Sequence, residues 1–248
     1  RSDNGNSYQE FSGNDLPAVG LNTWAHFAFV KNGRYGYFYV NGQRSTQTAD
    51  MYNSGTSAFY SSSAPLTIGA VNTSSTATNY FNGYLDDIKI TKGYAKYGLT
   101  NFTAPSSALG SAAETADVLK GGFEDLARNH GITKAGNTSI NSSVKKFGTS
   151  SMYFAAQSDY IEIPGGHFDF GSNDFTIEGW FYDSGSGGGN NVALDYRTGS
   201  GVAGSGSETF GFIFYLNSSG NGKFYIGLEA DASTLGLWPM FNSSSLAI

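Results

Sequence analysis

The clearest local pattern lies in residues 23–43, TWAHFAFVKNGRYGYFYVNGQ, where two sets of side chains alternate: Trp24, His26, Ala28 and Val30 on one side, and Ala25, Phe27 and Phe29 on the other. Such an alternation, with a period of two residues, indicates β-strands. Asn32-Gly33 and Asn41-Gly42 are dipeptides that favour type I′ turns, because both central residues of that turn have positive φ. The stretch therefore predicts a β-hairpin over 24–40, followed directly by a second tight turn.

Seven more runs have the length and the β-branched or aromatic content of strands. They are LTIGAV (66–71), YLDDIKIT (84–91), SSMYFAA (150–156), DYIEIP (159–164), DFTIEGWFY (174–182), FGFIFYL (210–216) and KFYIGLE (223–229). The last two flank NSSGNG (217–222), which predicts a second hairpin. Only residues 114–127 have helical spacing, and Gly121-Gly122 interrupts it. The pattern predicts an all-β protein.

Composition agrees with short strands joined by tight turns. The 248 residues are 39% hydrophobic and only 14% charged, which argues against disorder. A net charge of −6 argues against nucleic acid as a partner. No apolar run approaches the roughly 18 residues of a membrane helix, so membrane insertion is not expected. The absence of cysteine removes disulfides, thiol catalysis and thiolate metal sites.

The strand motifs resemble a known family when they are taken together. The series WAHFAFVKNG (24–33), YVNG (39–42), LTIG (66–69), YFNGYLDDIKITKGYAKY (80–97) and FTAP (102–105) resembles the C-terminal half of a LamG-like, concanavalin A-like lectin/glucanase domain. The series KFGTSSMYF (146–154), DYIEIP (159–164) and DFTIEGWFY (174–182) resembles its N-terminal half. The resemblance implies an antiparallel β-sandwich of the jelly-roll type.

The two halves stand in the reverse of the family order. We therefore assign residues 1–105 to the C-terminal half of one sandwich, 106–117 to a linker and 118–248 to the N-terminal half of a following sandwich. The small, polar composition of 103–117 and the non-methionine start favour a fragment of a tandem array. The alternative is that both halves close into one circularly permuted sandwich, which is tolerable where native termini lie close together.

Asp86 and Asp87 interrupt a strand, although strands avoid Asp. Strand alternation places Asp86 with Ile88 and Ile90, facing inward, and Asp87 with Lys89 on a solvated face. The two carboxylates then point apart and cannot act as a pair. A buried carboxylate needs hydrogen-bond donors, so we predict that Asp86 is a structural acceptor for backbone amides of a neighbouring loop.

Evidence for a metal or for catalysis in the sequence is weak. Residues 3–6, residues 172–174 and Asp195 carry oxygen ligands that calcium accepts, but none forms an Asp-x-Asp-x-Asp-Gly loop. No cofactor is therefore predicted, with calcium as a weak possibility. Glycoside hydrolysis needs two carboxylates at a defined separation. Glu162 and Glu178 are single glutamates without an acidic neighbour two residues away, so no catalytic residue and no enzyme activity are predicted.

Aromatic and charged residues near loops are the candidates for ligand binding. Asp195, Tyr196 and Arg197 border the Gly-rich stretches 185–191 and 199–208, and Trp238 lies in a Gly- and Ser-rich tail. These four residues are the predicted ligand-binding set. Trp24 and Trp180 lie inside strand motifs and are predicted to be core residues.

The resemblance implies a non-enzymatic binding and structural module that contacts glycans or partner proteins through rim loops. Similar repeats occur in phage structural and fibre proteins and in secreted bacterial proteins. We therefore expect a virion-surface or extracellular location, and a larger assembly with other copies or virion proteins. Two alternatives stay open: a glucanase-like glycoside hydrolase, and an architectural capsid or fibre repeat without a ligand.

Overall fold

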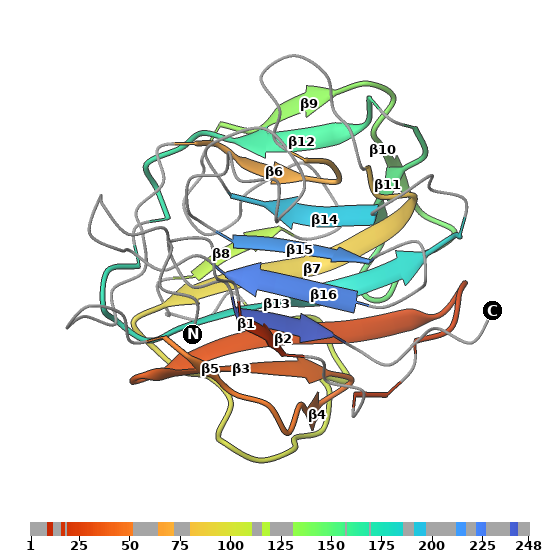
Figure 1. The fold of residues 1–248 in the computed structure, drawn as a ribbon. Helices are drawn as coiled ribbons and strands as arrows, with labels where there is room; N and C mark the ends of the chain where they lie inside the picture. The colour runs from red at the N-terminus through yellow and green to blue at the C-terminus, as the bar shows by residue number, and fades with distance from the viewer. Residues whose placement is uncertain are drawn as a thin grey trace.

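The protein is a two-layer assembly of β-strands in a computed structural model (Figure 1). The structure describes residues 9–11, 16–17, 19–51, 64–71, 80–110, 116–119, 131–156, 158–168, 170–185, 191–196, 212–216, 222–226 and 239–242. In this part of the chain there are 17 strands and no helix, and thus no helix that could cross a membrane.

The strands form two sheets. The eight-stranded sheet contains, in spatial order, β1 (Gln9–Phe11), β17 (Pro239–Asn242), β16 (Gly222–Ile226), β15 (Phe212–Leu216), β14 (Asn191–Asp195), β6 (Leu66–Ile68), β12 (Tyr160–Ile163) and β9 (Thr133–Ala135). The nine-stranded sheet contains β10 (Ser139–Asn141), β11 (Ser151–Phe154), β7 (Gly83–Lys92), β13 (Phe175–Asp183), β2 (Trp24–Asn32), β3 (Tyr35–Val40) and β4 (Gln43–Arg44), with β5 (Ala49–Asp50) beside β3 and β8 (Ala116–Leu119) beside β7. The antiparallel sandwich predicted from the sequence is confirmed.

The hairpin of β2 and β3 forms as predicted, but its first turn lies one residue later than expected. Asn32 pairs with Tyr35, so the loop is Gly33-Arg34, and of these two residues only Gly33 has positive φ (58°). Glycine at the first central position is typical of a type II′ turn. The second turn is the expected one, since both Asn41 and Gly42 have positive φ (49° and 77°).

Strands from the two ends of the chain are interleaved in both sheets. β13 lies between β2 and β7 in the nine-stranded sheet, and β6 lies between β14 and β12 in the eight-stranded sheet. The segments 1–105 and 118–248 therefore complete the same sandwich. Within the predicted linker, Leu109 is buried and β8 begins at Ala116, so this part of the chain packs on the sheet.

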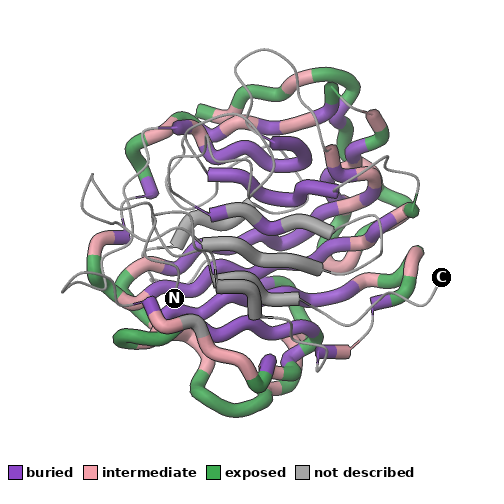
Figure 2. Tube along the Cα trace, in the orientation of Figure 1, coloured by how far each residue is buried: buried purple, intermediate pink, exposed green. Residues whose placement is uncertain are grey.

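The core lies between the two sheets and is rich in aromatic rings. Phe27 of β2 stacks on Phe214 of β15 with ring centroids 4.4 Å apart, and Phe181 packs on the same ring. Figure 2 shows that burial follows the central strands, whereas exposed residues gather in loops and at the strands of the sheet edges. The inward side chains of the alternating runs supply this core, as the sequence pattern indicated.

All seven further runs contain a strand of the structure, from β6 at 66–68 to β16 at 222–226. β15 and β16 pair antiparallel as the second predicted hairpin requires, although residues 217–221 between them lie outside the described part. The short strands β9 and β10 at the sheet edges and the buried β14 were not predicted. Edge strands of three residues leave too little pattern to detect.

Candidate functional site

The outer face of the nine-stranded sheet carries its polar and aromatic side chains in rows that cross the strands. Register aligns Trp24, Tyr182, Tyr84 and Tyr153 in the first row. One step further along the strands, the second row contains His26, Trp180 and Asp86. Glu178 and Lys89 then face each other in the third row. The rows differ in what covers them.

A β-bulge in β7 determines which side chains reach this outer face. Trp180 pairs with Asp86 and Glu178 with Lys89, so Gly179 alone faces two residues of β7. The extra residue is Asp87, which has a positive φ of 52°. Such a bulge shifts the alternation by one position. As a result Leu85 and Ile88 both face the core, although they are three residues apart.

The bulge corrects two predictions about the aspartates. Asp86 accepts hydrogen bonds from the amides of Lys146 (2.9 Å) and Phe147 (3.1 Å), which confirms its role as a structural acceptor. It lies on the outer face, however, and not inward beside Ile88. Asp87 is not solvated: it is 1% exposed and accepts a hydrogen bond from the Leu109 amide at 2.5 Å.

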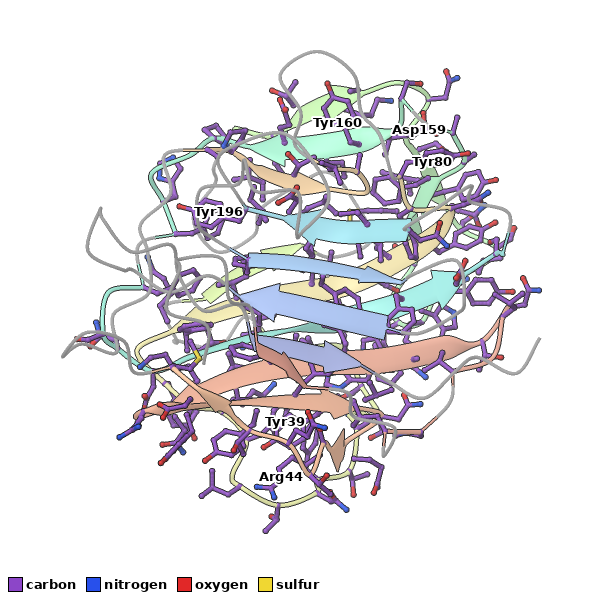
Figure 3. The ribbon with its side chains drawn as sticks, in the orientation of Figure 1. Tyr39, Arg44, Tyr80, Asp159, Tyr160 and Tyr196 are labelled. Carbon is purple, nitrogen blue, oxygen red and sulfur yellow. The ribbon has the colours of Figure 1, made fainter. Side chains whose placement is uncertain are left out.

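Residues 93–110, the first cover segment, lie across the second and third rows of this face, where they contact His26 and Glu178. Tyr97 stacks on Phe102 with centroids 3.6 Å apart, and Phe102 packs against Tyr39 of β3. The Tyr39 hydroxyl donates a hydrogen bond to the Gly98 carbonyl at 2.7 Å, and burial raises the pKa of Tyr39 to about 12. In Figure 3, Tyr39 lies beside Arg44 at the sheet edge formed by β3 and β4. A second, smaller apolar cluster thus forms outside the main core.

Glu178, on the sheet beneath the first cover segment, holds this segment in place through hydrogen bonds. Its carboxylate is fully buried and accepts hydrogen bonds from Lys96 Nζ (2.6 Å) and the Tyr97 hydroxyl (2.5 Å). His26 Nε2 lies 3.4 Å from the same carboxylate, and neither ring nitrogen of His26 has a hydrogen-bond partner. The anchor is therefore a buried charged group held by donors from a segment remote in sequence.

The pKa values in this cluster follow from burial and from the carboxylate. Burial alone raises the pKa of Glu178, but the contact with His26 and the charge and hydrogen bond of Lys96 together lower it below its ordinary value. Burial lowers the pKa of His26, although Glu178 acts in the opposite direction. Burial, followed by the charge of Glu178, raises the pKa of Tyr97. Glu178 is thus the anion of the cluster and His26 its neutral neighbour.

Residues 142–150, the second cover segment, close the second row. Lys146 Nζ lies 4.0 Å from the centroid of the Trp180 ring, and Phe147 packs edge-on against the same ring. Trp180 is 4% exposed, so the prediction that this side chain is buried is confirmed. It lies outside the main core, however, beneath the second cover segment. Asp86 fixes this segment through the two amide hydrogen bonds described above.

The first row remains half-exposed, because neither cover segment extends over it. Trp24, Tyr182, Tyr84 and Tyr153 lie on four adjacent strands at the end of the sheet where β2 and β7 begin (Figure 1). Tyr84 and Tyr153 stack at 4.7 Å, Tyr84 meets Tyr182 edge to face at 5.4 Å, and Trp24 tilts against Tyr182 at 5.5 Å. We call these four residues the aromatic row.

The aromatic row is a continuous, amphipathic surface. Strands lie about 4.8 Å apart, so the row extends over about 14 Å. Its three tyrosines combine an apolar ring with a hydroxyl, and Trp24 combines a ring with an indole N–H donor. Burial, followed by the neighbouring Tyr153 and Tyr182, raises the pKa of Tyr84, so the hydroxyl stays neutral at physiological pH. Such a surface suits ligands with apolar faces and hydroxyl edges.

The structure places the predicted ligand-binding residues elsewhere. Asp195 is the last residue of β14 and Tyr196, labelled in Figure 3, follows it; both are fully buried. The Tyr196 ring packs against Phe168 and Phe212, and is thus a core ring that offers no free face. Arg197 and Trp238 lie outside the described residues. The prediction of Trp24 as a core residue is wrong, since its side chain is half-exposed.

The described residues contain no group of three or more potential metal ligands. Asp174, from the predicted oxygen-rich stretch 172–174, accepts a hydrogen bond from the Gly33 amide at 2.7 Å and lies 3.9 Å from Lys31 Nζ. It therefore stabilises the β2–β3 turn. Residues 3–6 lie outside the described part.

The two glutamates considered for hydrolysis lie on different sheets. Glu178 belongs to β13 of the nine-stranded sheet, and Glu162 belongs to β12 of the eight-stranded sheet, where it pairs with Thr67. Glu178 is fully buried beneath the first cover segment. A shared substrate between these two carboxylates is thus excluded by the topology.

The fold and the sequence agree on one class of protein, an all-β sandwich of the concanavalin A-like type. Residues 1–94 match the family described as the concanavalin A-like lectin/glucanases superfamily. The resemblance seen in the motifs of this part of the chain is confirmed there. No curated protein and no solved structure matches the chain.

The aromatic row was missed at the sequence level because it depends on register. Its members come from positions 24, 84, 153 and 182, and pairing in three strand interfaces brings them together. One signal was available: each of these residues is an aromatic within a predicted strand run. That signal names candidates but does not align them.

Proposed function

We propose that the protein is a non-enzymatic glycan-binding module and that the aromatic row is its binding surface. The observation that carries the proposal is the contrast on one sheet face, where the inner rows are covered and the row of Trp24, Tyr182, Tyr84 and Tyr153 is left half-exposed. Half-exposed aromatic rings with polar edges favour ligands that are both apolar and hydroxylated, as sugars are.

The carboxylates support binding without catalysis. Glu178 is occupied by Lys96 and Tyr97, and Glu162 lies on the other sheet, so neither is placed beside the aromatic row. The superfamily includes both lectins and glucanases, and these contacts favour the lectin side of that description. We further propose the virion-surface or extracellular setting and the larger assembly expected from the repeat-like motifs.

Binding of β-linked oligosaccharides, measured by isothermal titration calorimetry, tests the proposal. Trp24→Ala removes the ring at one end of the row, and Tyr182→Ala removes a central ring. We expect each variant to bind at least about tenfold more weakly than the wild type. Tyr94→Ala is the matched control, because Tyr94 is 52% exposed and belongs to the first cover segment. Unfolding temperatures of all variants should stay near that of the wild type.

Two results would contradict the proposal. Row variants that bind every oligosaccharide as tightly as the wild type would show that the ligand lies elsewhere. Release of shorter sugars from the bound oligosaccharide, abolished by Glu178→Gln, would show an enzyme in place of a binding module.

A further inference from the structure

Tyr84 and Tyr153 form the closest pair of rings in the aromatic row. They stand directly opposite each other on the neighbouring strands β7 and β11, and their ring centroids lie 4.7 Å apart at an interplanar angle of 25°. Directly opposed residues of paired strands have Cβ atoms about 4.5–5.5 Å apart, so the backbone itself keeps the two rings together. The pair is therefore a fixed arrangement of two phenol rings.

The two strands that carry this pair come from remote parts of the chain. β7 lies in the segment 1–105 and β11 lies in the segment 118–248, and these two segments complete the same sandwich. The antiparallel pairing between β7 and β11 extends over only three residues of each strand. The chain contains no cysteine, so no disulfide can link the two segments. The tyrosine pair is a place where another kind of covalent link can form.

Both rings of the pair are accessible to solvent, because they are half-exposed and neither cover segment extends over them. Oxidative coupling of two phenols joins the ring carbons next to the carbons that bear the hydroxyl groups. Near-parallel rings at 4.7 Å bring these carbons of Tyr84 and Tyr153 close to one another. Tyr182 also contacts Tyr84, but it does so edge to face, at 84° and 5.4 Å. The stacked pair thus has the better geometry for coupling.

We propose that Tyr84 and Tyr153 are an oxidative modification site, at which a one-electron oxidant of the peroxidase class joins the two rings by a dityrosine bond. Each phenol loses one electron and its hydroxyl proton, which gives two tyrosyl radicals. The radicals combine through one ortho carbon of each ring, and the hydrogen on each of these carbons moves to the phenolic oxygen. The net change is one new carbon–carbon bond and the loss of two hydrogen atoms, which reduce one hydrogen peroxide to two waters.

The bond links the two segments of the sandwich covalently. It closes a loop that contains residues 85–152, and a crosslink across a long loop stabilises a protein mainly by restricting the unfolded chain. We expect the unfolding temperature of the oxidised protein to rise by at least about 5 °C. The reaction does not depend on glycan binding, since it needs only the two rings and the oxidant.

Oxidation of the dilute protein by a plant peroxidase and hydrogen peroxide provides the test. Mass spectrometry should show a monomer that has lost two hydrogen atoms, and fragmentation of its crosslinked peptides should place the bond between Tyr84 and Tyr153. Tyr35 and Tyr94 are 41% and 52% exposed, so coupling governed by exposure alone would join separate molecules through them. Dimers of this kind in place of the intramolecular bond would overturn the site.

Two conservative variants identify the partners of the bond. Tyr153→Phe retains a ring beside Tyr84 but removes one phenol, and we expect it to abolish the intramolecular bond and the rise in unfolding temperature. Tyr182→Phe, which changes a neighbouring ring of the same row, is the matched control and should leave the yield of the bond unchanged. A bond that persists in Tyr153→Phe, or one that is lost in Tyr182→Phe, would overturn the site.

Discussion

The outer face of the nine-stranded sheet has a covered part and an open part, and the two are built differently. In the covered part, buried anchors such as Glu178 and Asp86 hold remote segments through hydrogen bonds. In the open part, four aromatic rings pack against one another and leave a half-exposed surface. The same strands supply both parts, so position along each strand decides which role a residue has.

This difference indicates a division between stability and recognition. A buried anchor satisfies several donors at once, and its loss leaves those donors without partners. Removing a half-exposed ring lowers the free energy of unfolding only a little, because the surroundings of the ring are already hydrated. Substitutions in the covered part should therefore change the free energy of unfolding, whereas substitutions in the open part should change binding.

The largest effect is expected for Glu178→Ala. The change leaves Lys96 and Tyr97 without their acceptor, and breaking a buried charged network costs about 3 kcal/mol. Urea unfolding followed by circular dichroism measures this loss. Glu162→Ala, in the partly exposed outer face of the other sheet, is the control and should change the free energy of unfolding by less than about 0.5 kcal/mol. Equal effects of the two substitutions would remove the distinction between anchor and surface.

A smaller loss is expected for Asp86→Ala. Two amides of the second cover segment lose their acceptor, at a cost of about 2 kcal/mol. Asp86→Asn keeps one oxygen for both amides and should recover most of the stability. Hydrogen exchange of the Lys146 and Phe147 amides is the specific readout, and unchanged protection in Asp86→Ala would contradict the anchor role.

The pH dependence of stability should identify His26. Its pKa in the folded protein lies below 6.5, so below that pH the unfolded chain binds a proton that the folded chain does not. Stability then falls with acidification, by up to about 1.4 kcal/mol per pH unit. The lowered pKa of Glu178 acts in the same direction, but only as the pH falls below its ordinary value of 4.5. His26→Gln should abolish the slope just below pH 6.5 and retain the slope below 4.5.

Unfolding free energies measured at several pH values give both slopes. Persistence of the upper slope in His26→Gln would mean that another group titrates there. In that case the account of His26 as the neutral neighbour of Glu178 would be wrong.

The smallest effect on stability is expected in the open part. Tyr84→Ala removes a half-exposed ring from the aromatic row and should cost under about 1 kcal/mol, mainly through its stacking on Tyr153. Chemical denaturation of this variant beside Glu178→Ala compares the two parts directly. A loss from Tyr84→Ala as large as that from Glu178→Ala would show that the row is structural.

Local pattern was sufficient for much of the fold. The alternation around Phe27 and the Asn41-Gly42 turn predicted the β2–β3 hairpin, because strand period and turn geometry are properties of neighbouring residues. The acceptor role of Asp86 was also predictable, since a strand Asp must find donors. Its orientation was not, because one extra residue at Asp87 reverses the alternation and no local signal announced that bulge.

The candidate site was less predictable than the fold. Tyr196 was selected because it borders a Gly-rich stretch, yet the structure packs its ring into the core. Trp24 was assigned to the core because tryptophans bury large areas, yet its row lies beyond both cover segments. Both errors concern tertiary packing, which depends on which remote segment covers which row. Register and coverage are long-range properties that a single sequence does not display.

The three indole N–H signals in a nuclear magnetic resonance spectrum test the central claim most directly. Trp24 lies in the aromatic row and Trp180 is covered, and Trp24→Phe assigns the first signal. During titration with a β-linked oligosaccharide, the account predicts that the Trp24 signal shifts in proportion to saturation while the Trp180 signal stays in place. A Trp24 signal that does not move at saturating glycan would contradict the aromatic row as the binding surface.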